Sequence, residues 1–189
     1  MKKTAIVFAA ALALMLGCNL AAEILGKGET EPEIQEEHVY EEIDRMIQAG
    51  QTDEALKLLN QEEDHTSVEY YYLKEMIYLT DGSAEADEAL MELYPAAADQ
   101  WPQWQRMQMM AGVAAMYEGN YESAEYRLLQ ALRLDTENSE TWYYMGALAC
   151  KEGNYEDMRV YFERALELGL EESKQQQILW YAEQAGDRE

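Results

Sequence analysis

The feature that most constrains the fold is an internal repeat in the carboxyl-terminal third of the chain. Residues 118–135 (EGNYESAEYRLLQALRLD) align without gaps with residues 152–169 (EGNYEDMRVYFERALELG). We call the offset between these two stretches the repeat period. Self-similarity at a fixed period indicates stacked units that bury their apolar faces against their neighbours. The chain has only 11 glycines and 3 prolines among 189 residues, which favours helix over sheet or disorder. We therefore expect an all-α fold.

The spacing of small and apolar residues within these two units resembles the tetratricopeptide repeat family, whose period of about 34 residues the offset matches. In the last unit the matching residues are Trp142, Met145, Gly146, Gly153, Tyr155, Phe162, Ala165 and Leu168, and in the unit before it Ala111, Gly112, Gly119, Tyr121, Ala124, Leu128, Ala131 and Leu134. The sequence departs from the family pattern at Ala115 and Ala149, where a tyrosine is usual, and at Met158, where an alanine is usual. The resemblance implies a right-handed superhelical solenoid of helix-turn-helix repeats over residues 36–189.

Two glycines are expected to let the paired helices approach closely. These are Gly112 and Gly146, which we place opposite Ala124 and Met158, because a larger side chain at the crossing would force the hairpin apart. Each repeat should therefore be a tight pair of helices.

Three polar residues are expected to cap second helices. Asn120 and Asn154 each follow a glycine, and Thr52 precedes an acidic helical stretch; all three can accept a hydrogen bond from a free amide of the first turn.

Two degenerate copies precede the clear repeats. They span about 36–62 and 67–95, and Pro95 is expected to end the second one. After the fourth repeat, residues 171–185 read as one more first helix, a polar-faced capping helix that covers the exposed end of the stack. The chain should thus hold about four repeats plus a cap.

The amino terminus has the architecture of a bacterial lipoprotein signal. Lys2 and Lys3 precede a 12-residue apolar run at 5–16, too short to span a bilayer, and the run leads into Met15-Leu16-Gly17-Cys18. This resembles a lipobox, and the resemblance implies that residues 1–17 are removed and that Cys18 carries a covalent lipid. The alternative is an ordinary signal peptide that is cleaved after Ala21 or Ala22.

Residues 18–35 are expected to be an acidic tether. They contain glycines, a proline and several glutamates, with little periodic apolar content. Two acyl chains on Cys18 would give a firm anchor, since each buried methylene contributes about 0.8 kcal/mol. The folded part would then lie outside the cytoplasm, attached either to the outer membrane or to the outer face of the cytoplasmic membrane.

The charge balance limits the kinds of partner. The chain has 14 basic and 38 acidic residues, a net charge of −24. Nucleic acid is disfavoured because the basic residues are scattered rather than clustered, and an anionic bilayer would repel the folded part. Membrane contact is therefore expected through the lipid alone. The strongly acidic surface should stay solvated, so we expect a monomer or a weak oligomer.

The family resemblance implies a concave groove lined by the first helices. Carried onto this sequence, the groove positions are Tyr40, Asp44, Tyr71, Glu75, Tyr78, Arg106, Met109, Val113, Met116, Tyr143, Ala147, Cys150 and Lys151. An aromatic and Met-rich surface suits an extended peptide or a partner helix. The same residue types at helical spacing also suit packing between repeats, and the sequence leaves both interpretations open.

Catalytic and metal-binding patterns are weak. Neither histidine, His38 or His65, lies at a spacing typical of a catalytic triad, and Cys150 is expected to be a small buried residue. The acidic run 62–65 could gather a metal but has no second ligand pair. We expect no catalytic residue, no metal and no cofactor beyond the lipid on Cys18.

These features favour an adaptor that binds a partner protein in the cell envelope. In layout the chain is similar to repeat-containing lipoproteins that serve pilus-secretin and outer-membrane assembly. The alternative is extracytoplasmic capture of basic or extended peptides by an acidic groove. A metal-binding or enzymatic protein comes third.

Overall fold

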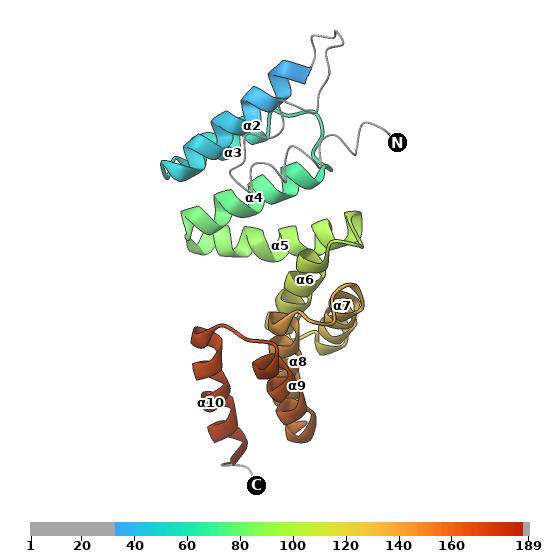
Figure 1. Cartoon of the computed structure of the whole chain (residues 1–189). Helices are drawn as coiled ribbons and strands as arrows, with labels where there is room; N and C mark the ends of the chain where they lie inside the picture. The colour runs from blue at the N-terminus through green and yellow to red at the C-terminus, as the bar shows by residue number, and fades with distance from the viewer. Residues whose placement is uncertain (1–32, 187–189) are drawn as a thin grey trace. The chain divides into compact units, whose positions relative to one another are not determined.

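The computed structural model describes residues 33–186, and all of its regular structure in that range is helical. By contacts, the chain divides into two units, Met1–Val39 and Tyr40–Glu189, and the packing described below belongs to the second. The described residues contain nine helices and no strand (Figure 1): α2 Glu33–Gln48, α3 Thr52–Leu59, α4 Val68–Asp81, α5 Ala84–Gln100, α6 Gln105–Tyr117, α7 Tyr121–Leu134, α8 Ser139–Glu152, α9 Tyr155–Glu167 and α10 Glu172–Gly186. The all-α fold class is confirmed.

The two clear repeats form the antiparallel helix pairs α6/α7 and α8/α9. Each first helix is followed by a glycine in the left-handed region, Gly119 with φ +78° and Gly153 with φ +77°, which turns the chain into the second helix. Asn120 and Asn154 then cap α7 and α9, each accepting a hydrogen bond at 3.2 Å from an amide three residues later. The expected helix-turn-helix unit and its two asparagine caps are confirmed.

The close approach expected at Gly112 and Gly146 is also confirmed. Ala124 lies opposite Gly112 as expected, since a Cβ on Gly112 would lie 3.2 Å from the backbone oxygen of Ala124, whereas the residue opposite Gly146 differs from the one expected. A Cβ on Gly112 would lie 2.8 Å from Cγ of Leu128, and a Cβ on Gly146 would lie 2.5 Å from the ring of Phe162. Met158 is buried one turn away and is not among the nearest neighbours of Gly146. Large apolar side chains therefore occupy the space at both glycines, and the Ala124 backbone also approaches Gly112.

Two expectations for the degenerate repeats are wrong. Pro95 lies inside α5, which continues to Gln100, because buried side chains on both sides of it, including Tyr94 and Ala97, hold the helix against the core. Their burial offsets the backbone hydrogen bond that proline cannot donate. Thr52 is the first residue of α3 rather than its cap, and the cap position, Gln51, makes no side-chain hydrogen bond to the helix.

The carboxyl-terminal helix α10 forms where the capping helix is expected. Its inner side is held by the buried Ile178 and the half-buried Tyr181. Its outer side is not purely polar, since Leu179 is 67% and Trp180 is 56% exposed. Trp180 lies one repeat period after Gly146, at the position where a first helix needs a glycine in order to pack closely against its second helix.

The amino-terminal segments predicted from sequence are mostly outside the described residues. This holds for the signal at 1–17, for Cys18 and for most of the tether at 18–35. Helix α2 begins at Glu33, within the last residues of the predicted tether and ahead of the predicted solenoid start at residue 36. Among the described residues, no helix is both long enough and apolar enough to cross a membrane.

Candidate protein-interaction surface

The first helices α4, α6, α8 and α10 are joined to one another by side-chain contacts, and we call the surface they share the first-helix face. Between α4 and α6, Arg106 Nη2 lies 2.8 Å from Glu75 Oε1. Between α6 and α8, Gln105 Nε2 donates a hydrogen bond of 2.9 Å to Thr141 Oγ1. These contacts tie three successive repeats together along the same side.

Two further contacts extend this face to the terminal helix. Lys174 Nζ on α10 lies 2.5 Å from Glu140 Oε1 on α8, and the hydroxyl of Tyr143 donates a hydrogen bond to Gln177 Oε1. The two residues of each pair are separated by the repeat period, so the contacts join equivalent turns of consecutive first helices. The repeat period is therefore visible directly in the contacts.

The Glu75–Arg106 pair is the most deeply held of these contacts. The Glu75 side chain is 2% exposed, whereas that of Arg106 is 46% exposed. Burial tends to lower the pKa of Arg106, but the hydrogen bond and charge of Glu75 outweigh it, so that the pKa is raised. Burial, with a further contribution from the Glu75 charge, raises the pKa of Tyr94 on α5. The pair thus fixes a half-exposed guanidinium at the start of α6.

Three charges of alternating sign occupy equivalent positions along the face. Arg106, Glu140 and Lys174 follow one another at intervals of one repeat period on α6, α8 and α10. Sequence reasoning selected Arg106 and missed the other two. Adding the repeat period to Arg106 would have identified both.

The predicted groove residues divide into accessible and buried sets. Asp44, Arg106 and Lys151 are exposed, Tyr40, Tyr71, Tyr78 and Cys150 are half-buried, and Glu75, Met109, Val113, Met116, Tyr143 and Ala147 are buried. The buried ones pack between helices, as the alternative interpretation of the pattern proposes: Met109, Met116 and Ala147 share one apolar cluster with Leu128, while Tyr143 belongs to another with Phe162. Partner contact through the accessible set stays a prediction.

Tyr117 is an accessible residue that sequence reasoning missed. It is the last residue of α6, its side chain is 74% exposed, and it lies one repeat period before the predicted groove residue Lys151. Burial raises the pKa values of Tyr143 and Tyr181, and the nearby Tyr117 hydroxyl adds to both effects. An exposed tyrosine thus stands beside the buried Tyr143 and the half-buried Tyr181 on this face.

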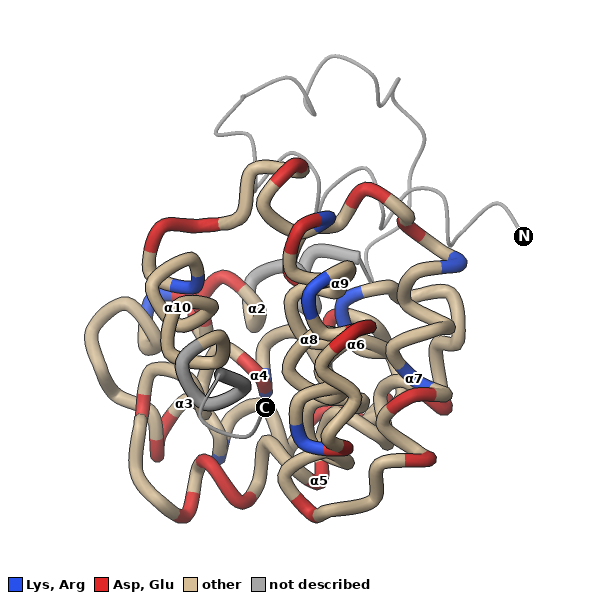
Figure 2. Tube along the Cα trace, turned by 90° about the horizontal axis from the view of Figure 1, so that it is seen from below, with Lys and Arg blue, Asp and Glu red and all other residues tan. Residues whose placement is uncertain are grey.

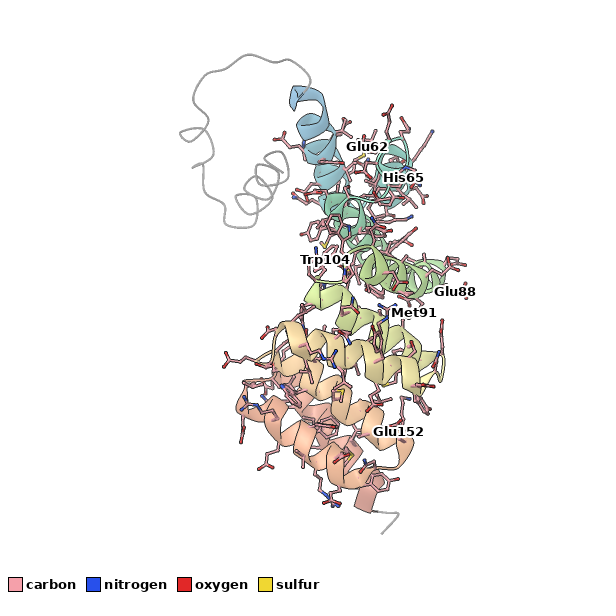
Figure 3. All side chains as sticks on the ribbon, turned by 90° about the vertical axis from the view of Figure 1, so that its right-hand side faces the viewer. Glu62, His65, Glu88, Met91, Trp104 and Glu152 are labelled. Atoms are coloured by element: carbon pink, nitrogen blue, oxygen red, sulfur yellow. The ribbon has the colours of Figure 1, made fainter. Side chains whose placement is uncertain are left out.

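The other sequence candidates do not form a chemical site. The His65 ring stacks on Tyr70, with ring centroids 4.7 Å apart, and Figure 3 places Glu62 and His65 at the α3–α4 connection. Within residues 33–186, no group of three or more His, Cys, Asp or Glu side chains is arranged to hold a metal ion. Cys150 is half-buried rather than buried. The side chain of His38 lies outside what the structure describes.

Charge is spread over the helices rather than gathered at one place. Figure 2 shows acidic segments on many helices and turns, with basic positions scattered singly among them. The described basic residues Arg106, Arg127 and Lys174 are each paired with a carboxylate. The structure accordingly offers no basic patch in its described part.

Comparisons with known proteins find similarity only among solved structures. MamA MSR-1 has a TM-score of 0.47 and 18% identity, over 72% of this chain and 97% of that chain. MamA AMB-1 has a TM-score of 0.42 and 18% identity, over 75% of this chain and 96% of that chain. No family model matches the chain, and no curated protein is found to be similar to it. At this level the similarity assigns no function.

Proposed function

We propose that this chain is a lipid-anchored adaptor of the bacterial cell envelope that binds a partner protein on its first-helix face. The observation that supports this most is the set of contacts joining α4, α6, α8 and α10, from Glu75–Arg106 to Glu140–Lys174. Such contacts hold neighbouring repeats in a fixed geometry, and a preorganised surface loses little entropy on binding. Helical repeat stacks bind other proteins through extended surfaces of this kind.

The accessible side chains suit a protein partner. Tyr71, Tyr78 and Tyr117 offer large rigid contact areas, and Arg106 and Lys151 can donate hydrogen bonds to acidic or polar groups. Met109 and Tyr143 are buried, so in this proposal they do not contact the partner. The working surface in this proposal is therefore narrower than the groove inferred from sequence.

The anchor rests on the sequence around Cys18. The charged start, the apolar run and the small residue before Cys18 together favour acylation of its thiol. A fatty-acid analogue fed to expressing cells should label the wild-type chain and leave the Cys18→Ala variant unlabelled. Labelling that survives the substitution would remove the anchor from the proposal.

The partner interaction is tested by crosslinking pull-downs from envelope extracts. Tyr71→Ala with Tyr117→Ala should lose partners that the wild type recovers, because both substitutions remove contact area from the first-helix face. Tyr126→Ala, an exposed tyrosine on the second helix α7, is the matched control. Recovery of the same partners by all three proteins would show that the face is not the binding surface.

The alternative function is capture of basic or extended peptides, and the net charge of −24 favours it. A salt titration of any recovered complex separates the two. Long-range attraction is screened within about 8 Å at physiological ionic strength, so acidic capture should weaken strongly with salt, whereas apolar docking should change little.

A further inference from the structure

The outer side of α10 carries two adjacent apolar side chains that are more than half exposed. They are Leu179, at 67%, and Trp180, at 56%, on the last described helix of the stack (Figure 1). In α8 the position equivalent to Trp180 is Gly146, which packs against Phe162 of the second helix α9. The position that a second helix covers in α8 is therefore open to solvent in α10.

The residues around this apolar pair carry no charge. Residues 175–182 (QQQILWYA) contain neither an acidic nor a basic residue, whereas charged residues make up 28% of the chain. Gln176 is exposed and lies one helical turn before Leu179 and Trp180, so all three share one side of α10. We call these three residues the α10 patch. Two copies of a chain with a net charge of −24 repel each other, and contact between them costs least where charge is absent.

The chemistry of the α10 patch is complementary to itself. A two-fold dimer brings the same surface of both copies together, so the residues of the patch have to match one another. Leu179 and Trp180 can bury apolar area against their counterparts. The side-chain amide of Gln176 both donates and accepts hydrogen bonds, so it can pair with a second glutamine. A basic or an acidic partner would find no opposite charge in the patch, which favours a second copy as the occupant.

We propose that the α10 patch joins two copies of this chain in a weak dimer with two-fold symmetry. Stable interfaces bury a total of about 1,200 Å² or more, and a patch on a single helix provides less than this. The dimer should therefore form and dissociate with protein concentration. The proposal does not depend on the partner protein proposed above, since it needs only this chain.

Analytical ultracentrifugation of the full-length chain over a range of concentrations tests the dimer. Leu179→Gln with Trp180→Gln should weaken dimerisation about tenfold or more, because tryptophan often carries much of the binding energy of an interface. Val160→Gln with Leu166→Gln replaces two exposed apolar residues on α9, at 58% and 43%, and is the matched control. A wild type that stays monomeric, or equal dimerisation in the two variants, would overturn the proposal.

The salt dependence of the dimer has an expected sign. Added salt screens the repulsion between two acidic copies, so it should strengthen a dimer held by an uncharged patch. A dimer that weakens as salt is added would be held by ion pairs, which contradicts pairing through the α10 patch.

A charge exchange at Leu179 tests the two-fold pairing. Leu179→Lys and Leu179→Glu should each dimerise more weakly than the wild type, because like charges then meet at the interface. An equimolar mixture of the two variants should recover the dimer, because opposite charges meet instead. A mixture that stays monomeric would show that the two patches do not face each other. No other protein is present, so these outcomes are independent of the pull-downs that test the first-helix face.

Discussion

Gly146 on α8 and Phe162 on α9 approach so closely that a Cβ on the glycine would lie 2.5 Å from the aromatic ring. The equivalent pair in the preceding repeat, Gly112 and Leu128, is slightly less tight, at 2.8 Å. Each first helix therefore packs on its second helix through a glycine that receives a large apolar side chain. This contact sets the spacing of the hairpin and so the position of the first-helix face.

Gly146→Ala should destabilise the protein by about 1–3 kcal/mol, because the rigid ring of Phe162 has to move. Gly112→Ala should cost less, since the end of a leucine side chain adjusts more easily than a ring. Urea unfolding followed by circular dichroism measures both values. If both variants were as stable as the wild type, the helices would not pack as closely as described.

Alkaline conditions should destabilise the protein through its buried tyrosines. Burial raises the pKa of Tyr94 and of Tyr143 above the ordinary value of 10.0. In both cases the unfolded state releases its proton first as the pH rises, so the stability is fully present below pH 10 and falls as the pH increases toward the folded-state pKa. Each such tyrosine should contribute a slope of up to about 1.4 kcal/mol per pH unit.

The variant Tyr143→Phe tests this account. The substitution should lower the free energy of unfolding by about 1 kcal/mol at neutral pH, because the hydrogen bond to Gln177 is lost. It should also reduce the alkaline slope of the unfolding free energy against pH by the contribution of one proton. Tyr126→Phe, at an exposed position, is the control variant. An unaltered slope in Tyr143→Phe would contradict the burial of its hydroxyl.

The ion pair between Lys174 and Glu140 should control how firmly α10 is docked. Both side chains are partly exposed, so the expected contribution is only about 0.5–1 kcal/mol. Lys174→Gln should therefore speed amide hydrogen exchange in α10 relative to α9. Lys151→Gln, an exposed lysine at the end of α8, removes the same charge as a control, and equal effects of the two variants would argue against a specific role for the pair.

The residues that could be predicted from sequence are those that recur at the repeat period. Gly112, Gly146, Asn120 and Asn154 recur in pairs, so local chemistry and period agree on their roles. Pro95 could not be placed, because its tolerance inside α5 depends on the burial of side chains on both sides of it, which is a tertiary effect. Local rules fail where packing over a longer range decides the outcome.

The candidate surface was predicted only in part for a similar reason. Period and family pattern locate the first helices, but they do not reveal how tightly these helices pack, and that packing buries Met109, Val113 and Tyr143. Tyr117 was missed although it lies one period before Lys151, since only one member of the pair was considered. Exposure therefore has to come from the structure, whereas position can come from the repeat.

The central claim, that the first-helix face is the binding surface, is tested most directly by site-specific photo-crosslinking in living cells. A photoreactive amino acid would replace Tyr117 on the first-helix face or Tyr126 on α7, both of which are exposed, at 74% and 58%. We predict that the residue at position 117 yields discrete crosslinked partners and that the residue at position 126 does not. Partners captured equally from both positions, or only from position 126, would contradict this account.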